Sequence, residues 1–471
     1  MERPNIVFYF SDQQRFDTLG CYGQSLPVTP CLDQLATESV RFQNAFTCQP
    51  VCGPARSCLQ TGLYATETGC FTNAISLSTS ARTLAHHFNE AGYDTAYIGK
   101  WHLASDRDCN HYETSNVPVE RRGGYRYWMA ADVLEFTSHG YNGYVFDTEG
   151  NKREFIGYRA DCINNFAIDY LHNRPKEKPF FLFVSHIEPH NQNDHMNFEG
   201  PDGSKEKFKD YVVPGDLEGT GGDWRQFYPD YLGECHSLDA NVGRLIDTLK
   251  AEGIWDNTIL IYTSDHGCHF RTRTPDYKRS CHENSLHIPL IIHGKQFSRG
   301  AVIDHLVSLI DLPPTLLDCA GIPVPDSYQG QSLLPLLKGE APECWPDSVF
   351  FQVSENQVGR GIRTKNGNIP RAAQAMAGRT AAAISITKNS CSISQKTRMR
   401  RTTSLLIRHM RRCAKSWPPS CRAGSSALNK STRRSCQRMR ILQNKHHKTA
   451  SPARMPARRF FCVTLSTQSD N

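Results

Sequence analysis

The chain is 471 residues long, contains 18 cysteines and has a formal net charge of +7. Its length exceeds the roughly 250 to 300 residues at which one hydrophobic core stops growing, so we expect a large main domain and a second, smaller unit. No apolar run approaches the ~18 residues that span a bilayer, so we expect no membrane segment. The cysteines are too scattered for a disulfide scaffold, which indicates reduced thiols.

Residues 1–355 alternate between short apolar runs and amphipathic stretches. The apolar runs are typical of buried strands, and the amphipathic stretches end close to glycines, as helices do. In chain order, we expect a strand at 6–10, a helix at 83–91, strands at 95–98 and 180–184, a helix at 231–250, strands at 258–262 and 288–292, and a helix at 312–320. Apolar strands separated by helices indicate an α/β fold with a mostly parallel sheet and helices on both faces.

Polar side chains directly follow four of these strands. Ligands of such sheets bind at the carboxyl ends of the strands, so we expect these side chains to gather at one edge. They are Asp12 and Gln13, Lys100 and His102, His186 and His190, and Asp265 and His266. The pattern predicts a functional site at this edge.

The last part of the chain breaks these patterns. Residues 366–471 contain 22 Lys and Arg residues and one acidic residue, Asp470, so this tail carries +21 and residues 1–365 carry −14. One interpretation is a disordered basic arm that binds polyanions. We favour a frameshift near Lys365, because a shifted frame across residues 366–370 permits the ordinary segment Trp-Lys-Tyr-Ser.

Residues 48–62 contain the most informative motif. It consists of Cys52, Pro54, Arg56, Thr61 and Gly62. The motif resembles the signature C-x-P-x-R of the sulfatase family with its following Thr-Gly pair, and the resemblance covers residues 3–365. It implies an alkaline-phosphatase-like fold and the oxidation of Cys52 to formylglycine by a formylglycine-generating maturation enzyme. The alternative for Cys52 is a buried or incidental thiol.

The chemistry gives a reason for an aldehyde at this position. An ordinary serine would form a sulfate adduct that is hard to break, whereas an aldehyde hydrate offers one hydroxyl to attack sulfur and a second to expel sulfate. Pro54 suits the first turn of a helix, which would place Cys52 at the positive end of a helix dipole. Arg56, one turn further on, can hold the hydroxyls and sulfate oxygens by charge-assisted hydrogen bonds.

The resemblance also implies a metal site. Asp12 with Gln13 and Asp265 with His266 resemble the family's two pairs of metal ligands, and the modified Cys52 bridges metal and substrate. A hard cation bound largely by oxygens is expected, with Ca²⁺ favoured and Mg²⁺ as the alternative. Gln13 stands where many members carry a second Asp and His266 where many carry Asn, and both still offer a ligand atom. The alternative for Asp12 and Asp265 is a loop or helix-cap aspartate.

Four further residues resemble catalytic residues of the family. Lys100 and Lys278 are placed like its two sulfate-binding lysines, and His102 is placed like the histidine that helps deprotonate the formylglycine hydrate. His186 resembles the histidine that protonates the departing alkoxide, a task suited to a group that titrates near neutral pH.

The resemblance therefore implies a sulfatase that hydrolyses sulfate esters, and the basic and aromatic loops favour a sulfated carbohydrate as its substrate. His190 and His195 are interpreted as substrate contacts or plain loop residues, and Trp101 and residues 125–128 as packing residues rather than a sugar platform. We expect a catalytic domain over 1–355 and, at 356–471, a remnant of the family's C-terminal subdomain that is missing or corrupted after Lys365.

Two other functions stay open. Phosphonate monoester hydrolases and phosphodiesterases resemble sulfatases in fold and metal pairs, and some carry a formylglycine, so Cys52 does not exclude them. An inactive polyanion-binding protein is the second alternative, because the basic tail predicts salt-dependent binding to nucleic acid or heparin-like polymers. We expect no membrane or nucleic-acid partner, and a cytoplasmic location for the sequence as written, with export only if an upstream start codon was missed.

Overall fold

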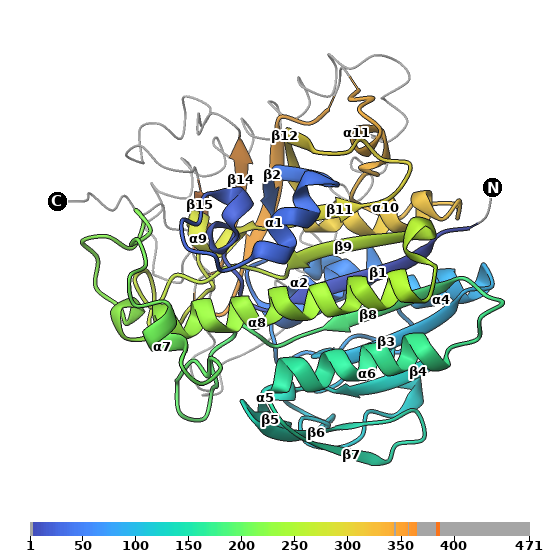
Figure 1. Cartoon of the computed structure of the whole chain (residues 1–471), viewed down its shortest axis with the longest axis horizontal. Helices are drawn as coiled ribbons and strands as arrows, with labels where there is room; N and C mark the ends of the chain where they lie inside the picture. Colours follow the sequence, from blue (N-terminus) through green and yellow to red (C-terminus); the bar gives the residue numbers. More distant parts are fainter. Residues whose placement is uncertain (1–2, 343–344, 357, 365–382, 387–471) are drawn as a thin grey trace, which may run out of the picture.

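The computed structural model describes residues 3–342, 345–356, 358–364 and 383–386, which alternate between strands and helices (Figure 1). The strands are β1 Asn5–Ser11, β2 Val40–Phe46, β3 Asp94–Lys100, β4 Tyr127–Ala131, β5 Ser138–His139, β6 Asn142–Phe146, β7 Lys152–Ile156, β8 Phe180–Ser185, β9 Thr258–Ser264, β10 His287–Ile288, β11 Leu290–His293, β12 Ala301–Ser308, β13 Ser348–Val353, β14 Val358–Thr364 and β15 Ala383–Ile386. The α-helices are α1 Pro30–Thr37, α2 Cys52–Thr61, α3 Ala65–Thr68, α4 Leu84–Glu90, α5 Leu134–Thr137, α6 Arg159–Asn173, α7 Ser204–Lys207, α8 Trp224–Ala251, α9 Glu283–Leu286, α10 Leu312–Cys319 and α11 Leu334–Leu337. No helix in these ranges is both long and apolar enough to cross a bilayer. The frameshifted tail predicted at 366–471 lies outside the described residues, apart from β15.

Twelve strands form one large sheet in the order β10-β2-β11-β9-β1-β8-β3-β4-β6-β5, with β12 paired to β2 and β7 to β6. The central run from β9 to β4 is parallel throughout, whereas β11 and β6 continue the sheet antiparallel on either side. Phe10 of β1 lies in register with Thr263 of β9 and Ser185 of β8, so the carboxyl ends of these strands are level. The predicted α/β fold with a mostly parallel sheet is confirmed.

Helices cover both faces of this sheet because its central strands are apolar on both sides. Ile6 and Phe8 of β1 pack in one core with α2, α4 and α10. Val7 and Tyr9 point the opposite way, into a second core with α1, α6 and α8. Figure 1 shows α8 and α6 crossing the sheet. The alternation along β1 therefore assigns each side chain to one of two helical layers.

The elements expected from the sequence are present, with boundaries that differ by a few residues. The largest difference is α8, which begins at Trp224 rather than at residue 231 and contains Pro229. Proline lacks a backbone N–H and disrupts most helices, which explains the late expected start. The strand expected at 288–292 is divided into β10 and β11 at Pro289, where proline interrupts the ladder in the same way.

A second sheet of three strands, β13-β14-β15, lies against the large one. The apolar side chains of β13 pack against the large sheet. The Gln352 N–H donates to the Cys48 carbonyl at 2.9 Å, and Gln49 Nε2 donates to Ser354 Oγ at 2.8 Å. The segment that precedes α2 is therefore held by residues near the end of the described chain.

The aromatic residues near β3 and β4 belong to the core. Trp101 and Trp128 are buried and pack around Tyr97, with ring centroids 4.9 Å and 5.5 Å from that of Tyr97. Tyr125 is also buried and packs 5.0 Å from the same ring. The expected packing role of these residues is confirmed.

Candidate active site

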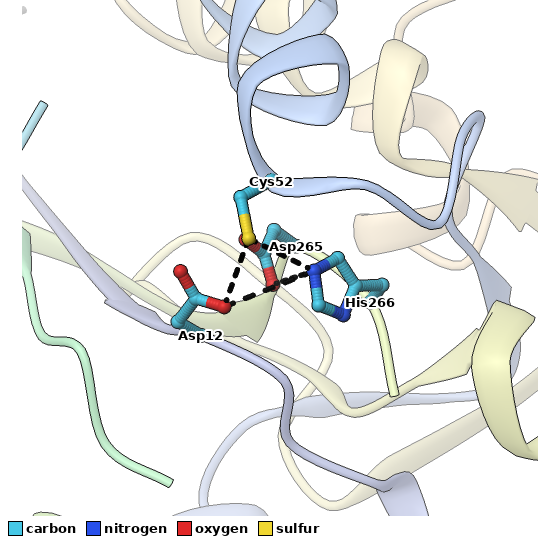
Figure 2. A group of neighbouring side chains, drawn as sticks. All are labelled: Asp12, Cys52, Asp265 and His266. Atoms are coloured by element: carbon cyan, nitrogen blue, oxygen red, sulfur yellow. Dashed lines mark hydrogen bonds and ion pairs between the residues drawn. The ribbon is translucent and has the colours of Figure 1, made fainter. Parts of the chain in front are cut away.

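Four side chains from distant segments meet at the carboxyl end of the parallel strands (Figure 2). Asp12 follows β1, Asp265 and His266 follow β9, and Cys52 begins α2. All four are buried. Cys52 Sγ lies 3.4 Å from Asp12 Oδ1 and 3.3 Å from His266 Nε2, and His266 Nε2 lies 3.5 Å from Asp265 Oδ1. The structure thus brings position 52 together with both acidic strand ends.

The backbone after β1 holds this cluster in place. The Gln13 N–H donates to Asp265 Oδ1 at 3.0 Å. Gln13 has a φ of 70°, in the left-handed region that is uncommon for residues other than glycine. Its Nε2 donates to Asn191 Oδ1 at 3.2 Å, while its Oε1 is buried without a hydrogen-bond partner in the described part of the chain. Backbone strain and an unpaired buried oxygen are typical of functional sites.

Cys52 is the first residue of α2, and Pro54 lies in the first turn, as the sequence predicts. The helix dipole favours negative charge at position 52. Lys278 Nζ donates to Sγ at 2.9 Å. Burial opposes ionisation of the thiol, but Lys278, Lys100 and His266 together hold the pKa of Cys52 well below its usual range. Position 52 is therefore suited to carry developing negative charge.

Arg56 and Lys100 both pair with Asp12. Arg56 Nη2 lies 3.1 Å from Asp12 Oδ2, and its Nη1 donates to Ser185 Oγ at 2.7 Å. Lys100 Nζ lies 2.9 Å from Asp12 Oδ2 and 3.1 Å from Glu135 Oε1. Burial opposes ionisation of Asp12, but Lys100 and the other nearby cations outweigh it, so the pKa of Asp12 lies well below its usual range. Asp12 is therefore a carboxylate that is held from several sides.

A cavity of about 500 Å³ opens onto Cys52. Gln13, His102 and Lys278 line it, as expected for residues of one site. His102 has a left-handed backbone, with φ 59°, and its Nδ1 is buried without a hydrogen-bond partner among the described residues. The wall also contains several polar and charged residues, namely Asn73, Arg107, His111, Glu113, Asn193 and Arg279. The cavity therefore offers a ligand polar contacts beside apolar ones from Val133, Phe136, Met196 and Tyr277.

One wall of this cavity depends on a residue that follows β13. Glu355 forms an ion pair with Arg279 and accepts a hydrogen bond from the Asn73 N–H at 2.8 Å. Asn73 Oδ1 in turn accepts from the Gly53 N–H at 2.9 Å, one residue after Cys52. Glu355 thus connects the cavity wall to the start of α2.

The structure does not bring His186 to the cavity. Along β8, Phe181 and Phe183 face the core that contains α2, whereas Val184 faces the core of α6 and α8. His186 continues in the second direction: it is fully buried, with its ring centroid 4.7 Å from that of Tyr9. Burial lowers the pKa of His186 to about 4, and neither ring nitrogen has a hydrogen-bond partner in the described ranges. The predicted role of His186 as proton donor to the leaving group does not fit this position.

A second histidine of the same loop, His190, does reach the cavity. It lines the cavity, and its Nε2 lies 2.7 Å from Lys278 Nζ, which itself donates to Cys52 Sγ. Burial and Lys278 lower the pKa of His190, which fits the neutral ring that Nε2 needs to accept a hydrogen bond. Of the two interpretations given for His190, the cavity position favours a ligand contact over a plain loop residue, and His195 does not line the cavity.

Glu135 belongs to the site but had no signal in the sequence. It lies on α5, a short helix outside every predicted strand end, and pairs with Lys100 at 3.1 Å. Burial opposes its ionisation, yet Lys100 lowers the pKa of Glu135 to about 2. Only the fold brings Glu135 to Lys100, because β4 pairs with β3 and is followed directly by α5.

The cluster in Figure 2 fits a divalent cation. The ligand atoms of Asp12, Cys52, Asp265 and His266 all lie within 4.8 Å of one another. Gln13 Oε1 and Asp265 Oδ2 are buried oxygens without a hydrogen-bond partner in the described segments. Burial and the nearby Asp12 raise the pKa of Asp265 to about 7, since two close carboxylates repel each other. A cation would relieve this repulsion and satisfy both oxygens.

Adding Ca²⁺ should therefore stabilise the folded protein. A ligand that binds only the folded state, at about 100 times its Kd, adds about 2.7 kcal/mol to the free energy of unfolding. We expect the temperature of thermal unfolding to rise with Ca²⁺ in the unmodified sequence and not in Asp265→Asn. Asp239→Asn is the matched control, because Asp239 is a buried carboxylate outside the cluster, held by backbone N–H groups on α1. Equal responses in all three proteins would contradict a cation site at Asp265.

Known proteins are similar to this chain in sequence and in fold. The sequence matches the Sulfatase family over residues 4–322. It is 32% identical over 387 residues to an ulvan-active sulfatase of Formosa agariphila, which covers 77% of this chain and 72% of that protein. It is 28% identical over 449 residues to an N-acetylglucosamine-6-O-sulfatase of Bacteroides thetaiotaomicron, which covers 78% of each. A solved structure in complex with its substrate D-glucosamine-2-N,6-O-disulfate is similar with a TM-score of 0.64 and 27% identity, over 77% of this chain and 87% of that one.

The family match and the geometry concern the same residues. The matched segment spans more than half of the chain and contains Asp12, Cys52, Asp265 and His266, which the fold brings into one buried cluster. The chain therefore belongs to the sulfatase family, has the alkaline-phosphatase-like fold of that family, and is a sulfuric ester hydrolase.

Proposed function

We propose that this protein is a formylglycine-dependent sulfatase that releases sulfate from a sulfated carbohydrate. The position of Cys52 carries the proposal, because this residue begins α2, lies 3.4 Å from Asp12 and opens onto the cavity. We further propose that Asp12, Gln13, Asp265, His266 and the modified residue 52 hold a divalent cation. Ca²⁺ is favoured because it accepts irregular oxygen coordination, whereas Mg²⁺ demands a near-ideal octahedron.

The formylglycine at position 52 and the bound cation would supply the reactive chemistry. A formylglycine hydrate at position 52 would supply one hydroxyl to attack sulfur and a second hydroxyl through which sulfate leaves, so that the aldehyde is restored. The cation would withdraw electron density from the sulfate oxygens. The residues of the chain bind the sulfate, orient these groups and move protons.

The lysines and Arg56 provide fixed positive charge around the sulfate. Lys278 Nζ lies 2.9 Å from Cys52 Sγ, so it would contact a sulfate held at position 52. Lys100 is locked between Asp12 and Glu135. Because these cations are already in place in the folded protein, they stabilise the transition state without reorganisation.

Two histidines serve the proton transfers. His102 lines the cavity, and its Nδ1 has no hydrogen-bond partner in the described part of the chain, so it can take the proton of the hydrate hydroxyl when sulfate is expelled. His190 takes the role of protonating the departing alkoxide, in place of His186, and does so from its protonated form, in which Nε2 carries the proton that passes to the alkoxide oxygen. Its Nδ1 contacts the Asn191 carbonyl, which fixes the ring, and its Nε2 lies beside Lys278 in the cavity.

The cavity wall supports a sugar as the sulfated substrate. Amide, carboxylate, imidazole and guanidinium groups line it, and such donors and acceptors bind hydroxyl groups better than they bind a flat hydrophobic ring. Two similar proteins are named for action on ulvan and on N-acetylglucosamine sulfate. The basic tail that suggested a polyanion-binding function lies outside the described residues, and nothing in the described cavity favours that function.

The proposal is tested by comparing substrates. We expect kcat/KM for N-acetylglucosamine 6-sulfate to exceed that for a phosphodiester, with sulfate release measured by ion chromatography. Asp12→Asn is the control, because it should remove turnover of both substrates if the same site acts on them. A phosphodiester rate that exceeds the sulfate ester rate would overturn the proposed substrate class in favour of phosphonate or phosphodiester hydrolysis.

A further inference from the structure

A second cluster of histidine and carboxylate side chains lies beside the cavity, apart from the catalytic cluster. His139 ends β5, and Asp194, His195 and Glu199 belong to the loop that follows β8. The ligand atoms of His139, His195 and Glu199 all lie within 4.8 Å of one another. The two imidazole rings are nearly parallel, with centroids 5.6 Å apart. Two imidazoles and a carboxylate thus converge on one point.

Each ring has one nitrogen beside Glu199 and the other beside Asp194. His195 Nε2 and His139 Nδ1 lie 3.1 Å and 3.6 Å from Glu199 Oε1. On the other side, His195 Nδ1 lies 2.8 Å from Asp194 Oδ1, and His139 Nε2 lies 3.5 Å from Asp194 Oδ2. Glu199 Oε2 is buried and has no hydrogen-bond partner in the described part of the chain.

The four contacts suit a cation between the rings and Glu199. A neutral imidazole has one N–H and one lone pair. If each ring donates its N–H to Asp194, two lone pairs point at the Glu199 carboxylate, which is repulsive unless a cation lies between them. A metal ion there would be bound by all three ligand atoms, and Asp194 would orient both rings, as carboxylates do behind metal-bound histidines. A protonated His195 between the two carboxylates is the metal-free alternative, and the zinc titration below distinguishes the two.

The ligand set indicates the kind of metal. Two imidazole nitrogens and one glutamate oxygen, with a fourth position for water, are typical of zinc sites. Tetrahedral zinc with bonds of about 2.0 to 2.1 Å places neighbouring ligand atoms about 3.4 Å apart. The distances of 3.1 Å and 3.6 Å from Glu199 Oε1 lie on either side of this value. Ca²⁺ prefers oxygen ligands and does not suit a site with two imidazoles.

We propose that His139, His195 and Glu199 bind a Zn²⁺ ion that ties the loop after β8 to strand β5. All the ligand side chains are accessible to solvent, with 49%, 42% and 19% of their surface exposed, so the ion can reach them. Within the same loop, Asn193 and Met196 line the catalytic cavity. The ion would therefore fix one wall of the cavity from outside it.

The loop has the geometry of a tight turn that such a link would hold. The Gln192 N–H donates to the Asn197 carbonyl at 2.7 Å, which closes the turn. Met196, between these two residues, has a φ of 52°, in the left-handed region. Asn193 Nδ2 donates to Glu135 Oε1 at 3.4 Å, which connects the turn to the ion pair of Lys100. A change in the position of this turn would therefore move Glu135 and, through it, alter the ion pair with Lys100.

The test is a zinc titration of the full chain in saturating Ca²⁺. The unmodified sequence should bind one more equivalent of Zn²⁺ than the double variant His139→Ala/His195→Ala. His172→Ala is the matched control, because His172 is an exposed histidine 2.9 Å from Glu252 that lacks a second imidazole, and it should bind as many equivalents as the unmodified sequence. The histidines and cysteines of residues 365–471 are the same in all three proteins, so they cancel in the comparison.

Three further measurements make the result specific. Glu199→Gln keeps the size of the ligand and should also lose the equivalent, and Co²⁺ in place of Zn²⁺ should give the intense visible absorption of a tetrahedral site only when all three ligands are present. Hydrogen exchange of residues 191–199 should slow on addition of Zn²⁺. Equal stoichiometry in the unmodified and double-variant proteins would overturn the site, and unchanged exchange would overturn its effect on the loop. None of these measurements needs turnover, so the outcome is independent of the proposed function.

Discussion

Replacing Cys52 with alanine should lower kcat/KM for sulfate ester hydrolysis by at least about 10⁴-fold, in line with the loss of other covalent nucleophiles. Residue 52 supplies the atom that bonds to sulfur, and the surrounding cations only bind and stabilise charge. The measurement is sulfate release by protein produced together with a formylglycine-generating enzyme. The unmodified sequence produced without that enzyme should be as slow as Cys52→Ala, because a thiol cannot take the place of the hydrate.

Cys58→Ala is the matched control for this prediction. Cys58 is buried in the same helix, packs in the apolar core and does not line the cavity, so its loss should reduce stability by about 1 kcal/mol and leave kcat/KM unchanged. Mass spectrometry of the tryptic peptide 42–56 checks the modification directly. This peptide contains Cys48 and Cys52, and conversion of one thiol to an aldehyde lowers its mass by about 18 units. High activity in protein whose Cys52 remains a thiol would contradict the proposal.

Replacing His190 with alanine should lower kcat for alkyl sulfate esters by about 10² to 10⁴-fold, the usual contribution of a general acid. A sugar alkoxide is a poor leaving group and needs a proton as it departs. The loss should be much smaller for an aryl sulfate with an acidic phenol, because that leaving group departs without protonation. The measurement is kcat for both kinds of ester in the same variant, which separates proton donation from a general loss of activity.

His186→Phe is the comparison that decides between the two histidines. The phenylalanine ring can keep the contact with Tyr9 and removes two buried nitrogens that have no hydrogen-bond partner among the described residues, so stability should be retained or increased. Because His186 does not line the cavity, kcat should stay unchanged for both esters. A loss of activity on alkyl esters in His186→Phe, with normal activity in His190→Ala, would return the role to His186.

The position of the proposed metal ligands could be predicted from the sequence because it depends on a simple property of parallel sheets. Asp12 and Asp265 each follow an apolar strand, and strands that run in parallel end at the same edge. Pro54 predicted only that Cys52 lies at the start of a helix, which the structure confirms. The place of Cys52 beside these residues was implied by its resemblance to the sulfatase signature, so a topological rule and a family motif together predicted the centre of the site.

The choice between His186 and His190 could not follow from strand position alone. Both come just after β8, but the two-residue alternation of β8 points His186 to the face opposite Cys52. That alternation is visible in the sequence and would have excluded His186. His190 reaches the cavity because the loop after β8 folds back toward it, and no short-range pattern in the sequence predicts that fold. Glu135 was missed for the same reason, because its contact with Lys100 exists only in three dimensions.

The contacts of Gln352 and Glu355 show how far the catalytic machinery extends. Both residues lie past position 322, where the family match ends, yet they hold the segment before α2 and the wall beside Arg279. We therefore expect the smallest active unit of this enzyme to reach at least to Glu355. A fragment that keeps every reactive side chain but stops at the family boundary would lose the supports that keep residue 52 aligned.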